Sequence, residues 1–331
     1  MDSIHLILLR IFRPILDVTC AVACTAYENM GCNCTKEKLV LNSRRFYVQK
    51  RLGEGGFSVV DLVEEGPTGK LFACKRIMCH SKSDEKVALE ELEYYRRFAH
   101  PNLIMLEESG MIPRGDICEV LLVLPFYRRG MLQEALDKLK ENGQHYSQTQ
   151  LLRLFKGICD GVRELHNAKP TAIAHRDIKP HNVMLADDDS PVLMDFGSMA
   201  PARLEVVGRS EAIALQDTAG EKCSMLFRAP ELFHVESHCV INEKIDIWSL
   251  GCTLFNMAYL YSPFEPIYMK GDSIHLAVIG RNFKFPETSE YAPVVNDLIS
   301  SMLVVEPMER PTIEWVLDQV NNMTAEMENR V

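Results

Sequence analysis

Hydrophobic and polar positions predict a series of β-strands that begins at Phe46. The segment FYVQKRLG combines aromatic residues with apolar and polar alternation, which is typical of a strand. A glycine-rich turn leads into VVDLVEE, and Gly66-Pro67-Thr68-Gly69 leads into LFACKRI. We therefore expect consecutive strands joined by tight turns. Helices are expected at residues 84–98, which have an acidic start, and near residues 311–324.

Residues 4–16, IHLILLRIFRPIL, form the most apolar stretch near the N-terminus. Arg10, Arg13 and Pro14 interrupt it, whereas a membrane-spanning helix needs about 20 apolar residues. A signal peptide also matches poorly, because Asp17 lies inside the apolar region. We expect no membrane span here.

Composition excludes two broad classes of protein. The chain has 331 residues, of which 47% are hydrophobic, so it can form a packed core and is not disordered throughout. A net charge of −10 argues against nucleic acid as the main partner, because that role needs a basic surface. Length alone allows one large domain or about two ordinary ones.

The cysteines indicate a reducing compartment. Most of the 11 cysteines are scattered through apolar segments, as single core residues are. Cys20, Cys24, Cys32 and Cys34 crowd the N-terminus, but their spacing matches zinc fingers poorly and no histidine follows nearby.

The glycine-rich turn, Gly53 to Ser58, stands between two strands, which argues against a dinucleotide-binding fold. Such a turn could approach phosphates through its backbone or be an ordinary hairpin turn. Lys75 lies in an apolar strand nearby, either as a phosphate ligand or as an edge lysine. Its acidic partner could be Glu90, Glu91 or Glu93.

The decisive motifs come later in the chain. They are HRDIKPHN at residues 175–182, DFG at 195–197, APE at 229–231 and DIWSLG at 246–251. With the glycine-rich turn and the strand lysine, they occur in the order and spacing of eukaryotic protein kinases, which the chain resembles over residues 46–325. A small-molecule kinase shares part of this pattern, but APE and DIWSLG favour a protein substrate.

The resemblance implies an α+β, bilobal protein-kinase fold with a small β-rich N-lobe and a mainly helical C-lobe. The domain division that we expect comprises an upstream extension (1–29), a lipid-anchor arm (30–45), the N-lobe (46–124), the hinge (125–128), the C-lobe (129–325) and a tail (326–331).

The resemblance also implies the catalytic roles and the cofactors, ATP and Mg²⁺. Asp177 would accept the proton of the substrate hydroxyl, Lys179 would steady the γ-phosphate, and Asn182 and Asp195 would hold Mg²⁺. Glu91 would pair with Lys75. Contacts with ATP are expected from Leu52, Gly53, Glu54, Gly55, Gly56, Phe57, Ser58, Val60, Ala73, Lys75, Glu91, Pro125, Tyr127 and Leu185.

The segments GEGGFSVVDLVE, LLVLPFYRRG and VLMDFGSM are similar to the Numb-associated kinase family, above all to its Golgi-associated, myristoylated and palmitoylated branch. The resemblance implies a serine/threonine kinase that can phosphorylate itself, with some tyrosine activity or a purely scaffolding kinase fold as alternatives. It implies an extra helix around residues 210–217. The alternative is a flexible activation loop with phosphorylation sites at Thr218 or Ser224.

A second start of translation is the last hypothesis. Met30-Gly31-Cys32-Asn33-Cys34-Thr35 matches the N-myristoylation pattern if translation begins at Met30, although an internal Met-Gly could also arise by chance. Cys32 and Cys34 are candidate palmitoylation sites. The basic cluster Lys36, Lys38, Arg44 and Arg45 follows them.

These features predict anchoring to the cytoplasmic face of Golgi, perinuclear or plasma membranes, with a cytosolic pool when the chain is not lipidated. The identity of the protein substrates and the oligomeric state stay open.

Overall fold

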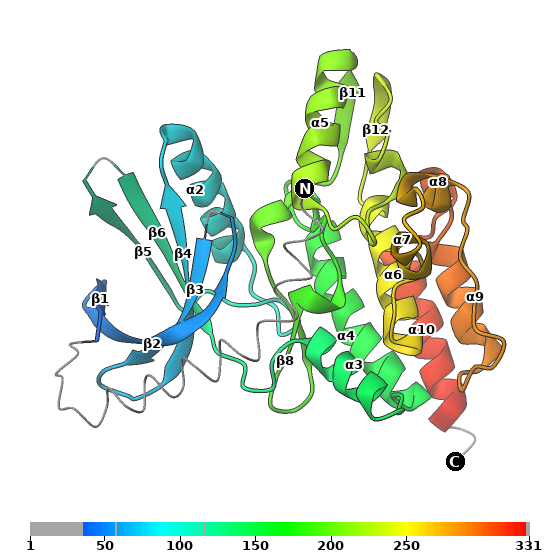
Figure 1. Ribbon diagram of the computed structural model, residues 1–331, viewed down its shortest axis with the longest axis horizontal. Coiled ribbons are helices and arrows are strands. Elements are labelled where there is room, and N and C mark those ends of the chain that lie inside the picture. The colour runs from blue at the N-terminus through cyan, green and yellow to red at the C-terminus, as the bar shows by residue number, and fades with distance from the viewer. Residues whose placement is uncertain (1–35, 57, 116, 329–331) are drawn as a thin grey trace.

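The computed structural model of the protein describes residues 36–56, 58–115 and 117–328. These residues form two lobes: a six-stranded sheet with one helix, and a larger, mainly helical lobe (Figure 1). The expected α+β, bilobal fold is confirmed.

The N-lobe sheet is antiparallel and has the order β1-β2-β3-β4-β6-β5. The strands predicted from residue 46 to residue 77 are present. The bounds are β1 Lys38–Leu41, β2 Arg44–Glu54, β3 Ser58–Glu65, β4 Leu71–Cys79, β5 Glu108–Arg114 and β6 Ile117–Pro125.

The N-lobe has its own apolar cluster on one face of this sheet. Leu39 and Leu41 of β1 pack with Phe46, Phe72 and further buried residues. The rings of Phe46 and Phe72 meet edge to face, with centroids 5.8 Å apart. The opposite face of the sheet packs against α2 (Lys82–Arg97).

The folded domain begins before residue 46. We had expected the lipid-anchor arm to extend to residue 45. β1 and the first residues of β2 belong to the sheet, and Leu39 and Leu41 are buried. The physical reason is that these two alternating leucines complete the apolar cluster, most of whose other members lie further along the chain, between Val63 and Val123.

Helix α2 begins at Lys82, two residues before the predicted start. The Ser81 hydroxyl accepts a hydrogen bond from the N–H of Asp84, and the Asp84 carboxylate accepts one from the N–H of Ser81. This reciprocal cap satisfies the first free N–H groups of the helix. Glu91 and Tyr95 are buried on its inner face.

The C-lobe is built around α6 (Lys244–Tyr259), which is buried from Ile245 to its end. Its other helices are α3 Leu132–Glu141, α4 Gln148–His166, α5 Arg209–Lys222, α7 Glu265–Met269, α8 Ile274–Ile279, α9 Pro293–Met302 and α10 Ile313–Glu328. The short strands are β7 Ile173–Ala174, β8 Val183–Leu185, β9 Pro191–Leu193, β10 Ala200–Pro201, β11 Leu204–Val207 and β12 His238–Ile241. The 3-10 turns are η1 Pro180–Asn182, η2 Phe196–Ser198, η3 Pro230–Leu232 and η4 Pro307–Glu309.

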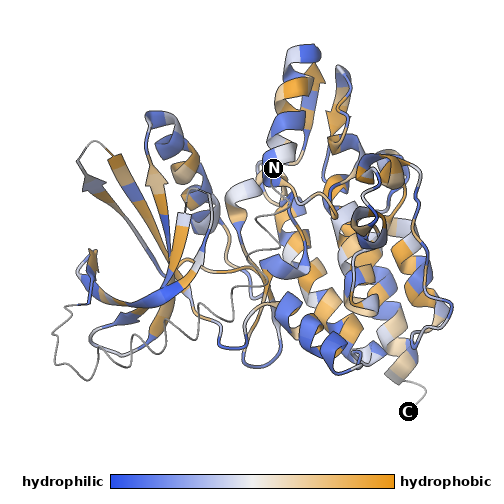
Figure 2. Ribbon diagram, viewed as in Figure 1, coloured by the Kyte–Doolittle hydropathy of each residue, from blue (hydrophilic) through white to orange (hydrophobic). Residues whose placement is uncertain are grey.

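The helix predicted near residues 311–324 is α10, which packs against α4. It continues to Glu328, so the helix runs into the segment that we had assigned to a tail. Along α4, polar and apolar stretches alternate in Figure 2, as expected for a helix with one buried face.

The extra helix expected around residues 210–217 is confirmed as α5, and it is longer than predicted. It projects from the C-lobe beside the two-stranded sheet of β11 and β12 (Figure 1). Ala212, Leu215 and Ala219 are buried on one side of α5. This spacing of three and four residues makes one apolar helix face. The activation segment, which runs from Asp195 to Glu231, therefore contains a packed helix.

The described residues contain no helix that is both long enough and apolar enough to cross a bilayer. Residues 4–16, where we expect no membrane span, lie outside the described part of the chain.

Candidate active site

The buried carboxylate of Asp246 on α6 holds the backbone at the start of the catalytic loop, which is the HRDIKPHN segment at residues 175–182. Its Oδ2 accepts a 2.8 Å hydrogen bond from the N–H of His175, and its Oδ1 accepts one of 2.8 Å from the N–H of Arg176. Nε2 of His166 lies 3.0 Å from Oδ2. These contacts keep Arg176 at a φ of 69°, in the left-handed region. Burial alone would raise the pKa of Asp246, but the bonds from His166 and the backbone lower it.

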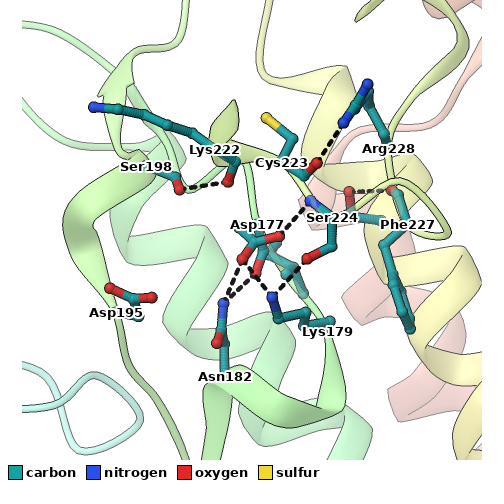
Figure 3. Close-up of polar contacts among 12 residues, drawn as sticks. Asp177, Lys179, Asn182, Asp195, Ser198, Lys222, Cys223, Ser224, Phe227 and Arg228 are labelled. Atoms are coloured by element: carbon teal, nitrogen blue, oxygen red, sulfur yellow. Dashed lines mark hydrogen bonds and ion pairs between the residues drawn. The ribbon is translucent and has the colours of Figure 1, made fainter. Parts of the chain in front are cut away.

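Asp177 lies at the centre of a polar cluster (Figure 3). Nζ of Lys179 is 2.8 Å from Oδ2 of Asp177, and Nδ2 of Asn182 donates to the same oxygen at 2.8 Å. Asn182 also donates to the carbonyl of Asp177. Ser224 completes the cluster, because its N–H donates to Oδ1 of Asp177 and its hydroxyl lies 2.5 Å from Nζ of Lys179. The catalytic loop and the end of the activation segment are thus joined.

Lys75 on β4 forms a second charged group with residues from two other elements. Its Nζ lies 2.7 Å from Oε1 of Glu91 on α2 and 3.1 Å from Oδ1 of Asp195. Of the three glutamates left open by the sequence, the partner is Glu91. Burial alone would lower the pKa of Lys75, but Asp195, Tyr95 and Glu91 together raise it above its usual value.

The same ion pair keeps Asp195 ionised. Burial would raise the pKa of Asp195, but the charge and hydrogen bond of Lys75 lower it. Asp195 has a φ of 65°, so its backbone is left-handed where the chain turns into η2. The next residue, Phe196, is buried beneath α2.

Phe196 stacks on Tyr95, with ring centroids 4.4 Å apart, and meets His175 edge to face. Gly197 follows, and a Cβ there would lie 3.2 Å from Oε2 of Glu91. A side chain at this position would therefore press on the ion pair with Lys75.

Several of the residues expected around ATP lie on neighbouring strands of the N-lobe sheet. Gly53 pairs with Val60 and Val60 with Lys75 across β2, β3 and β4. Ala73 is opposite Leu124. In the glycine-rich turn, the N–H of Gly55 donates to the carbonyl of Ser58 at 2.7 Å. Leu52 and Glu54 are exposed at the end of β2, and Gly56 is exposed in the turn.

The expected hinge begins inside β6, since Pro125 is its last residue and pairs with Phe72. The carbonyl of Tyr127 accepts a hydrogen bond from the N–H of Gly130. The carbonyl of Gly130 in turn accepts one of 3.0 Å from the N–H of Leu185. Leu185 is therefore tied to the segment that follows the hinge.

The two candidate phosphorylation sites differ in their surroundings. Thr218 is exposed on α5, and its hydroxyl donates to the carbonyl of Ala214 within the same helix. Ser224 is half-buried against Lys179. Phe57, Gly31, Cys32 and Cys34 lie outside the described residues.

Two supporting contacts were not predicted. Tyr95 stacks on Phe196, although its position four residues after Glu91 on a helix could have placed it on the same face. Arg310 is buried and makes two 2.7 Å contacts with the carboxylate of Glu231. These two residues are 79 positions apart, so no local pattern pointed to their pairing.

Comparisons with known proteins agree with this geometry. A family model described as protein kinase domain matches residues 46–320. Serine/threonine-protein kinase 16 of Rattus norvegicus is 42% identical over 289 residues, which cover 87% of this chain and 93% of the relative. Serine/threonine-protein kinase ppk13 of Schizosaccharomyces pombe is 32% identical over 313 residues, which cover 85% of this chain and 91% of the relative. The chain therefore belongs to the protein kinase family and is a serine/threonine kinase.

Proposed function

We propose that this kinase transfers the γ-phosphate of ATP to serine or threonine hydroxyls of proteins at a lipid-anchored membrane site. The observation that supports the catalytic part best is the cluster of Asp177, Lys179, Asn182 and Ser224. It places one ammonium, one side-chain amide and one backbone N–H within hydrogen-bond distance of the same carboxylate, and the ammonium also contacts the Ser224 hydroxyl. Phosphoryl transfer depends mainly on positioning and on charge stabilisation of this kind.

Asp177 is the group that orients the acceptor hydroxyl and takes its proton. Oδ1 is held by the N–H of Ser224, and Oδ2 is held by Lys179 and Asn182. The carboxylate therefore cannot rotate freely, and the accepting lone pairs keep a fixed direction. Lys179 lies close enough to stabilise negative charge on the transferred group.

Lys75 binds the α- and β-phosphates of ATP in this proposal. Its raised pKa keeps the ammonium charged at all physiological pH values. Glu91 holds the lysine in place, because the two side chains are largely buried and 2.7 Å apart. Val60 lies on β3 opposite Lys75, and Ala73 lies on β4 two residues before it; these two side chains form one wall of the adenine site, with Leu185 opposite them.

The residues present fit the divalent metal that a protein kinase domain implies. Asn182 offers an amide oxygen, and Asp195 offers a carboxylate that is partly exposed and ionised. Mg²⁺ prefers such hard oxygen donors, and it commonly uses one or two carboxylates together with phosphate oxygens. When bound, Mg²⁺ neutralises charge on those phosphate oxygens.

The membrane part of the proposal rests on Gly31, Cys32 and Cys34. A myristoyl chain on Gly31 gives only weak membrane binding, and a second acyl chain on either cysteine makes it stable. Golgi or perinuclear membranes are the proposed site, because the local sequences are similar to the lipid-modified branch of the Numb-associated kinases.

Two substitutions test the two parts separately. Asp177→Asn should abolish transfer of phosphate to an acceptor peptide, while circular dichroism should show that the chain still folds; measurable turnover would refute the catalytic assignment. In cells that translate the chain from Met30, Gly31→Ala should move the kinase from the membrane fraction to the cytosolic fraction. Unchanged fractionation would refute the lipid anchor without affecting the catalytic assignment.

A further inference from the structure

The hairpin of β1 and β2 has one buried face and one exposed face. Leu39 pairs with Phe46, and both are buried in the N-lobe cluster. The neighbouring pairs, Lys38 with Tyr47 and Val40 with Arg45, lie on the opposite face, because side chains alternate along a strand. We call this exposed side the hairpin face and include Lys36, which precedes β1. Val40 is 53% exposed, although the N-lobe core lies directly behind it.

The basic cluster expected from the sequence is divided by this fold. Arg44 turns away from the hairpin face, since its Nε lies 2.7 Å from Oε1 of Glu65 and its guanidinium lies over the ring of Phe46. Lys38 and Arg45 are exposed and have no salt bridge among the described residues. These two cations are therefore available to a ligand outside the protein.

The carboxylates near the hairpin are mostly engaged elsewhere. Glu37 points to Arg76, with contacts of 2.9 and 3.0 Å. Glu108, the first residue of β5, accepts a hydrogen bond from Asn42 in the hairpin turn. The register places Glu64 on the hairpin face, opposite Tyr47, where its Oε2 accepts a hydrogen bond from Gln49. Lys36 also contacts Gln49. Among the described residues of this face, the three cations Lys36, Lys38 and Arg45 exceed the one carboxylate, Glu64.

The position of the hairpin face relative to the anchor suggests what covers it. Cys34 precedes Lys38 by four residues, which span at most about 14 Å even when fully extended. If Cys32 and Cys34 carry acyl chains, the hairpin face lies within that distance of the lipid headgroups. Exposed lysine and arginine are attracted to anionic lipids, and a tyrosine beside an apolar residue suits the bilayer interface.

We propose that the hairpin face lies against a bilayer containing anionic lipids and so fixes the orientation of the kinase on the membrane. This inference rests on the lipid anchor proposed above. In Figure 1 the hairpin is at the outer end of the N-lobe, remote from α5 and the C-lobe. A bilayer that approaches from this end leaves the C-lobe free to bind a protein substrate.

The first test uses the full chain without acyl groups and vesicles of phosphatidylcholine with roughly one third phosphatidylserine. Each cation near such a surface is worth roughly a fivefold gain in partitioning, so Lys38→Glu with Arg45→Glu should weaken sedimentation with vesicles by at least about 25-fold. Lys138→Glu with Lys140→Glu, on exposed positions of α3, is the matched control of equal charge change. An equal loss in both double variants, or no loss in the hairpin variant, overturns the proposal.

The second test measures orientation. Val40→Trp should be quenched by brominated lipids in these vesicles, whereas Met308→Trp, at a position 75% exposed in the C-lobe, should show no more quenching than the wild-type chain. Equal quenching at both positions overturns the orientation.

A second copy of the chain is the other candidate for covering this face. If the Lys38 and Arg45 variants dissociate a dimer in sedimentation and leave vesicle binding unchanged, the bilayer is excluded.

The anchor and the hairpin face can fail separately. The vesicle tests use acyl-free protein, so their result does not depend on Gly31. If Gly31→Ala leaves the membrane fraction of cells unchanged but the hairpin variant loses vesicle binding, the anchor is wrong and the hairpin face still binds lipid. If Gly31→Ala releases the kinase and the hairpin variant binds vesicles normally, the anchor stands and the proposed face is wrong.

Discussion

The N–H of Ser224 donates a 2.8 Å hydrogen bond to Oδ1 of Asp177, while the Ser224 hydroxyl lies 2.5 Å from Nζ of Lys179. Ser224 therefore holds the Asp177 carboxylate through its backbone and contacts the Lys179 ammonium through its side chain. Substitution at Ser224 can remove the second contact and keep the first.

Ser224→Ala should lower kcat for an acceptor peptide by about ten- to a hundredfold. A hydrogen bond to a charged group contributes roughly 1.5 to 3 kcal/mol, and only this bond is lost. Ser224→Thr restores a hydroxyl and should recover most of the activity. Steady-state kinetics with saturating ATP measure the effect, and an alanine variant with wild-type kcat would exclude a role for this contact.

Lys75→Met should reduce kcat by at least about a hundredfold, because it removes the cation that pairs with Glu91 and Asp195. Circular dichroism should show an unchanged fold. Lys70→Met is the control. Lys70 is exposed, and its Nζ lies 3.6 Å from Oε1 of Glu107 at the surface. Comparable losses in both variants would contradict the specific role of Lys75.

The motifs of the catalytic loop could be predicted because their information is local. Asp177, Lys179 and Asn182 lie within six consecutive positions, and phosphoryl transfer requires these side chains at that spacing. Lys75 and Glu91 were also paired correctly. The sequence alone left three glutamates open, and only the resemblance to kinases favoured Glu91.

Contacts between distant segments could not be predicted in the same way. β1 was taken for part of an arm, since Leu39 and Leu41 are only two apolar positions and their partner Phe72 lies far along the chain. α5 was predicted too short because Ala219, near its end, is buried by packing on the C-lobe. In each case the deciding interaction is tertiary.

Thr218→Ala should leave kcat within about twofold of wild type. α5 is already packed through Ala212, Leu215 and Ala219, and the Thr218 hydroxyl bonds to its own helix. The space lined by Arg176 and Thr218 is only about 10 Å³, roughly the minimum for one water molecule. A tenfold or larger loss of kcat would instead favour a phosphorylation switch.

Breaking α5 should lower kcat, in contrast to Thr218→Ala. Ala214→Pro removes a backbone N–H inside the helix and introduces a clash, at a cost of about 3 kcal/mol. We expect a lower kcat and faster proteolysis near residue 214. Ala214→Ser, at the same exposed position, should retain both the helix and the activity. Full activity of the proline variant would show that α5 is dispensable for catalysis.

Asp246→Asn should lower the free energy of unfolding by about 3 kcal/mol and also lower kcat. The fully buried carboxylate accepts hydrogen bonds from the N–H groups of His175 and Arg176. Asparagine keeps one accepting oxygen, but its NH2 group takes the place of the other carboxylate oxygen and cannot accept a hydrogen bond, so one buried donor loses its partner. Asp318→Asn, at an exposed position on α10, is the control and should change neither quantity.

The effect of Asp246→Asn should depend on pH in a defined direction. The pKa of Asp246 is lowered in the folded chain, whereas in the unfolded chain it is about 3.9. As the pH falls, the unfolded chain therefore takes up the proton first, and the stabilisation by the carboxylate is lost. Urea titrations should show a difference in stability between wild type and variant that shrinks as the pH falls below about pH 4. A difference that is constant down to pH 3, or grows there, would show that Asp246 is not held ionised by these contacts.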